Sequence, residues 1–129
     1  MREYQGSYRR LVVWRNAARL RKLVYDITAR FSRGEMRRVS QMRDSARSVK
    51  QNIQEGYCRS SIGEYAHFLE ISQGSLGELS GDIDDCFEDK LITKKEFEVL
   101  DELCGKTDYL LKRLIQSLRK WPKERKWKS

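Results

Sequence analysis

Apolar residues recur along the chain in steps of three and four, which places them on one face of a helix. The run Val13, Ala17, Leu20 and Val24 is an example. Four such runs follow one another and predict helices over about residues 11–31, 36–57, 62–88 and 94–120. Their mean spacing of about 3.5 residues indicates left-handed, coiled-coil-like packing. No segment alternates as a strand would.

The ends of these runs carry recognisable signals. Gly34 can adopt the left-handed conformation that stops a helix. Ser61 and Glu64, and likewise Thr93 and Glu96, have the spacing of a capping box at the start of a helix. Pro122 follows the last run, and we expect the basic tail 121–129 to be frayed.

Short connections between long helices predict an all-α, antiparallel, up-down-up-down four-helix bundle, with residues 1–129 as one domain. Gly74, Gly77 and Gly81 fall inside the third helix, where we expect a neighbouring helix to approach closely. Apolar residues beside the main stripes, Trp14 and Tyr25 among them, could line a wide core or be shared between subunits. We expect a homo-oligomer that buries them.

The cysteines and the hydropathy pattern indicate where in the cell the protein is located. Cys58, Cys86 and Cys104 are an odd number with no close pair, which argues for a reducing cytoplasm and for three small side chains that are buried or half-buried. No apolar run approaches the roughly 18 residues of a membrane span, and the first residues lack an apolar signal core. We therefore expect a cytoplasmic protein without membrane contact.

Charge is strongly segregated along the chain. Residues 1–60 carry a net charge of +10, residues 61–105 one of −9, and residues 106–129 one of +7, within a total of +8. Such segregation creates a local field that attracts a polyanion. The acidic third helix could in turn face another subunit or a basic partner.

The basic residues are the sharpest functional signal. Arg15, Arg19 and Lys22 recur on the first helix with the same spacing as Arg43, Arg47 and Lys50 on the second, so antiparallel neighbours could merge them into one stripe. Arginines also crowd the first turn, and the tail interleaves cations with Trp121 and Trp127. Cations neutralise phosphates and tryptophan can stack on bases. The predicted nucleic-acid-binding residues are Arg15, Arg19, Lys22, Arg37, Arg38, Arg43, Arg47, Lys50, Lys120, Lys123, Arg125 and Lys126. A solvated face or an acidic protein partner are the alternatives.

The sequence contains few residues arranged for catalysis or metal binding. Glu64 and His67 form an E-x-x-H pair of the kind that binds iron in helix bundles, but His67 is the only histidine in the chain. Neither a glycine-rich phosphate loop nor a serine beside a recognisable base occurs. We therefore expect a non-enzymatic protein that uses no cofactor or metal.

Three stretches resemble a known family: Val13–Ala17, Ser40–Tyr57 with its N-x-x-E-G element, and Phe68–Leu79 with its G-S-L-x-E-L element. In order and spacing they resemble the four-helix-bundle proteins encoded in 23S rRNA intervening sequences. Those proteins are similar in fold to the accessory variability determinant (Avd) proteins of diversity-generating retroelements. The resemblance covers roughly residues 8–118.

The resemblance implies a homopentameric barrel of bundles with basic surfaces. It further implies either an accessory subunit that assists a reverse transcriptase and contacts RNA or DNA, or the rRNA-intervening type, which has no settled activity. Combined with the charge pattern, the leading hypothesis is an oligomeric bundle that binds nucleic acid electrostatically. The alternative is a protein–protein scaffold whose charged faces dock a protein partner.

Overall fold

The computed structural model describes residues 8–127 of the 129-residue chain. Four long helices make up this part: α2 (Val12–Thr28), α3 (Met36–Tyr57), α4 (Ile62–Glu88) and α5 (Lys94–Leu118). A single 3-10 turn, η1 (Arg33–Glu35), links α2 to α3. No strand occurs in the described residues, so the predicted all-α class is confirmed.

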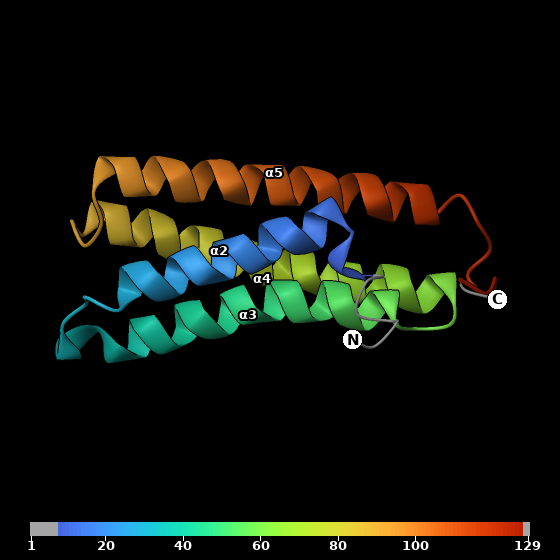
Figure 1. The fold of residues 1–129 in the computed structure, drawn as a ribbon, viewed down its shortest axis with the longest axis horizontal. Helices are drawn as coiled ribbons and strands as arrows, with labels where there is room; N and C mark the ends of the chain where they lie inside the picture. The colour runs from blue at the N-terminus through green and yellow to red at the C-terminus, as the bar shows by residue number, and fades with distance from the viewer. Residues whose placement is uncertain (1–7, 128–129) are drawn as a thin grey trace.

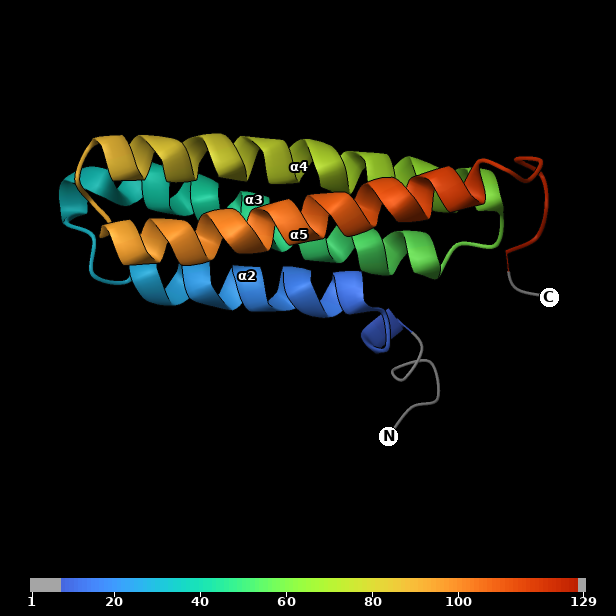
Figure 2. The ribbon, with the colours of Figure 1, turned by 90° about the horizontal axis from the view of Figure 1, so that it is seen from above.

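The helices form an antiparallel bundle (Figures 1 and 2). In the described chain α3 contacts α2 and α4, while α5 closes the ring by contacting α4 and α2. The α2–α3 and α4–α5 connections lie at one end of the bundle, which we call the loop end. The α3–α4 turn and the C-terminal segment lie at the other end. The four-helix bundle predicted from short connections is thereby confirmed.

The predicted apolar stripes point into the bundle. Leu20, Val49, Leu69 and Leu111 are among the fully buried residues, one from each helix. Among the buried polar residues, the hydroxyls of Thr28, Ser72 and Thr107 donate to backbone carbonyls, that of Ser72 to Val49 O at 2.7 Å. These three hydroxyls therefore cost little on burial, whereas the buried Tyr65 hydroxyl has no hydrogen-bond partner among the described residues.

Glycine allows close helix packing at Gly56, not at the positions that the sequence suggested. A Cβ at Gly56 would lie 3.0 Å from both Phe68 Cβ and Tyr65 O, so glycine lets α3 approach α4. At Gly74, Gly77 and Gly81 a Cβ would meet nothing within 4 Å. The expected close approach at these three glycines is therefore wrong, because they lie on parts of α4 that no neighbouring helix covers.

Two predicted helix ends are corrected. The first helix ends at Thr28 instead of residue 31, and Gly34 does not take a left-handed conformation. The left-handed residue is Lys90 (φ 62°), where the N–H of Leu91 bonds to Cys86 O and closes α4 in a Schellman-type turn. The last helix ends at Leu118, two residues before the predicted end.

Helix starts behave largely as predicted. Thr93 and Glu96 form a complete capping box at α5. At α4 the Ser61 hydroxyl accepts from Glu64 N at 3.2 Å.

The first N–H groups of α4, those of Ile62 and Gly63, donate to Arg125 O and Lys123 O of the C-terminal segment. The C-terminal segment is therefore docked on the start of α4 and not frayed as expected, through residue 127; residues 128–129 lie outside the described part.

The cysteines do not all lie where we expected. Cys86 and Cys104 are buried, and burial raises the pKa of both thiols, that of Cys104 to about 12. Cys58 is exposed, contrary to expectation. In the described part of the chain, no helix has the length and apolar character needed to cross a membrane.

Candidate nucleic-acid interface

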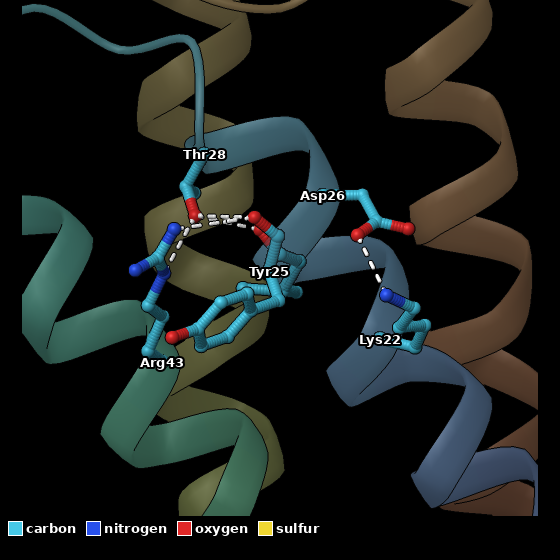
Figure 3. Close-up of polar contacts among 6 residues, drawn as sticks. Lys22, Tyr25, Asp26, Thr28 and Arg43 are labelled. Carbon is cyan, nitrogen blue, oxygen red and sulfur yellow. Dashed lines mark hydrogen bonds and ion pairs between the residues drawn. The ribbon is translucent and has the colours of Figure 1, made fainter.

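The predicted basic stripe across α2 and α3 does not form as a single surface. Arg15, Arg19 and Lys22 are all exposed on α2. Figure 3 shows Lys22 paired with Asp26 on the opposite side of α2 from Arg43. The merging of the two sets is therefore wrong, because the α2 residues occupy a different face of their helix.

Each of these three side chains has its own neighbours. Lys22 Nζ lies 3.0 Å from Asp26 Oδ1 on the next turn. Arg15 donates to the carbonyl of Arg10 at 3.2 Å. Arg19 lines a shallow hollow beside α5, with Glu102 and Lys106.

Arg43 faces α2, and its contacts there stabilise the bundle. Its Nε donates to Thr28 Oγ1 at 3.1 Å and one terminal nitrogen donates to Tyr25 O at 3.2 Å (Figure 3). The guanidinium also lies over the Tyr25 ring, 3.7 Å from its centre. Tyr25 O also accepts the N–H of Ala29 within α2, so Arg43 adds a further bond there and ties the last turn of α2 to α3.

A groove of about 590 Å³ runs between α2, α3 and their connection. Four arginines line it, together with aromatic and apolar side chains. These arginines are Arg21, Arg33, Arg43 and Arg47. Asp44 is the one carboxylate among the lining residues, so the groove carries an excess of positive charge.

Lys50 extends this positive charge along α3. It is half-buried, with Nζ 5.6 Å from the centre of the Trp14 ring. Burial lowers the pKa of Lys50, and the nearby charges of Arg21, Arg47 and Arg9 lower it further. We call Arg21, Arg47 and Lys50 the basic cluster, in which like charges converge from two helices.

The cluster contains a residue that the sequence prediction omitted. Arg21 stands in the same register of α2 as Trp14 and Tyr25, and its guanidinium lies 5.7 Å from the Tyr25 ring centre. Trp14 and Tyr25 already stood out as apolar residues beside the main stripe. That flanking register marked the side of α2 that meets α3, and could have identified Arg21.

The remaining predicted residues lie elsewhere. Arg38 is bound to two carboxylates, Glu35 Oε1 and Asp89 Oδ2, each at 3.0 Å. Arg37 is exposed beside this acidic region. The tail cations are exposed at the other end of the bundle. They are Lys120, Lys123, Arg125 and Lys126.

Acidic residues gather on α4, where it borders α3 near the loop end. Asp82, Asp85 and Asp89 line a hollow there, and Gln41 donates to Asp82 at 3.2 Å. Burial raises the pKa of Asp82. Across the described residues, no group of three or more histidine, cysteine or acidic side chains could hold a metal ion.

Comparison with known proteins places the fold. A crystal structure from Bacteroides thetaiotaomicron VPI-5482, of a protein of unknown function from the S23 ribosomal protein family, aligns with a TM-score of 0.75 and 18% identity. The alignment covers 81% of this chain and 99% of that one. No curated protein matches the chain. The model of the 23S rRNA-intervening sequence protein family matches residues 9–126, so the chain belongs to that family, as its sequence motifs suggested.

Proposed function

We propose that the protein is a non-enzymatic nucleic-acid-binding bundle whose basic cluster holds phosphates. The observation that carries this proposal is the convergence of Arg21, Arg47 and Lys50 on one face without a carboxylate partner among the described residues. Gathering like charges costs free energy unless an anion binds, so the cluster is suited to an external polyanion. Regularly spaced phosphates provide that charge.

The aromatic rings beside the cluster support this choice of polyanion. Trp14 and Tyr25 line the same face, each within cation–π distance of a cluster residue. The surface offers charge and flat apolar area, and the four labelled helices lie alongside one another in the bundle (Figure 2). Binding should therefore depend on phosphates and shape, with little base specificity.

The test is a double charge reversal, Arg47→Glu with Lys50→Glu. Arg43 is left unchanged because it ties the end of α2 to α3. We expect affinity for structured RNA or duplex DNA to fall at least about tenfold near 0.1 M salt, and the slope of log K against log salt to decrease by roughly 2. Fluorescence anisotropy across about 50–200 mM salt measures both.

The matched control reverses two exposed lysines in the first turn of α5, Lys94→Glu with Lys95→Glu, which gives the same change in net charge. It should keep most of the affinity. An equal loss in both variants would show that net charge alone drives binding. If the unaltered protein binds no nucleic acid at 50 mM salt, the proposal fails and a scaffold that docks an acidic protein becomes the better account.

The finer expectations from the family resemblance stay predictions. They are a ring of five subunits and a role beside a reverse transcriptase. Exposed Val12, Val99 and Tyr109 leave apolar surface for subunit contacts, and sedimentation analysis would measure the assembly. The cytoplasmic location likewise stays a prediction.

A further inference from the structure

The C-terminal segment is held against the bundle by its backbone. The N–H groups of Ile62 and Gly63 donate to Arg125 O and Lys123 O at 2.9 and 3.0 Å, and Ser61 and Lys126 form an isolated antiparallel bridge. Figure 1 shows the segment turning back beside the α3–α4 turn. These bonds supply acceptors for the first N–H groups of α4, so the segment has a defined position.

Gly63 fits closely against the docked segment. A Cβ there would lie 3.1 Å from Lys123 Cβ and 3.2 Å from Lys123 O. A side chain at this position would therefore require Lys123 to move by a few tenths of an ångström.

The two tryptophans of the segment have different roles. The indole N–H of Trp127 donates to Tyr57 O at 3.1 Å, and its ring contacts the rings of Tyr57 and Tyr65. Trp127 therefore anchors the segment. Trp121 is 50% exposed, and the Arg125 guanidinium lies 3.9 Å from its ring centre.

Between these tryptophans lies a hollow of about 480 Å³, within the size range of small-molecule sites. Its lining residues provide an apolar floor, two indole rings and two cations, and no carboxylate. They are Ile62, Leu118, Trp121, Arg125, Lys126 and Trp127. A flat aromatic ring joined to a negative charge matches this lining, and a nucleotide unit has both.

We propose that this hollow receives an unpaired nucleobase of a single-stranded nucleic acid. The base stacks against Trp121, and Arg125 and Lys126 contact the adjoining phosphate. The site rests on the proposed nucleic-acid function but is separate from the basic cluster, because it lies at the other end of the bundle from the α2–α3 connection. A base inside a duplex is not available for stacking, so the site distinguishes single strands from duplexes.

The test compares a short single-stranded RNA with a duplex of the same length, using the full chain and Trp121→Ala. We expect the variant to bind the single strand about tenfold more weakly and the duplex as before. The control is Tyr109→Ala, which removes another exposed aromatic ring (59%) that has its own arginine, Arg113, at 5.8 Å and lies outside this hollow. It should leave both affinities unchanged.

A mononucleotide titration gives a second readout. Adenosine monophosphate should quench the tryptophan fluorescence of the full chain, whereas Trp121→Phe should lose most of the quenching, and inorganic phosphate at equal ionic strength should cause little. Equal quenching by phosphate would show an anion site without base stacking and would overturn the proposal. So would unchanged single-strand binding by Trp121→Ala. A third outcome separates the two proposals. If the Arg47→Glu, Lys50→Glu protein loses nucleic-acid binding and Trp121→Ala does not, the base-stacking site is rejected and the proposed function stands.

Discussion

The loop end of the bundle and the α2–α3 face are both rich in arginine, yet the arginines do different work. At the loop end Arg30 donates two hydrogen bonds to Glu96, and Arg38 binds Glu35 and Asp89. On the α2–α3 face the basic cluster has like-charged and aromatic neighbours, and within the described residues it forms no ion pair with a carboxylate. Arginines with carboxylate partners join segments distant in sequence, whereas the cluster keeps its charge available to an external anion.

Arg43 lies between these two classes, and replacing it should have the largest effect on the fold. We expect Arg43→Ala to lower the free energy of unfolding by about 2 kcal/mol, because two hydrogen bonds from a charged donor to the end of α2 and the stacking on Tyr25 are lost. It should also weaken nucleic-acid binding. Urea unfolding followed by circular dichroism measures the first effect. Unchanged stability would move Arg43 into the class of available charges.

Replacing Arg38 tests the arginines that have carboxylate partners. Arg38→Ala should lower the free energy of unfolding by about 1 kcal/mol, because the side chain is mostly covered and links α3 to Asp89 after α4. Nucleic-acid affinity should stay within about twofold of the original, although the sequence prediction included Arg38 among the binding residues. A large loss of affinity with unchanged stability would erase the distinction between the two regions.

Most of the fold was accessible from the sequence because apolar periodicity and capping motifs are local signals. The α3 and α4 ranges, the capping box at Thr93 and the buried stripe all follow from spacing. The end of α2 did not, because the apolar spacing continues to Phe31 whereas the helix ends at Thr28. The docked C-terminal segment depends on Gly63 and Tyr57, about 60 and 70 residues earlier in the chain, which no local pattern reveals.

The candidate site was less accessible, for two physical reasons. First, equal spacing of basic residues on two neighbouring helices does not bring these residues onto a shared face. Arg19 and Lys22 lie on a face of α2 that is turned away from α3. Composition also cannot tell a paired cation from an available one, as Arg38 illustrates. Arg47 and Lys50 were predicted, and their nearby partner Arg21 was missed.

The ion pair between Arg30 and Glu96 should give stability a pH dependence. Arg30 holds the pKa of Glu96 at about 2, against an ordinary value of 4.5. A lowered pKa in the folded state adds stability above about pH 4.5, and this stability is lost as pH falls towards 2. Glu96→Gln, which keeps an oxygen for the Thr93 N–H, should cost less than about 1 kcal/mol near pH 7 and almost nothing at pH 2. Thermal unfolding of both proteins across this range checks the prediction.

The smallest expected effect has the opposite sign and addresses the basic cluster. Arg47 is exposed and repels Lys50, so Arg47→Gln should raise the free energy of unfolding by a few tenths of a kcal/mol near 0.02 M salt. The gain should vanish near 0.5 M salt, where charges are screened over a few ångströms. The same variant should bind nucleic acid more weakly. A loss of stability at low salt would mean that Arg47 stabilises the fold, as Arg38 and Arg43 do. The positive charge of the basic cluster would then not be available to bind an external anion.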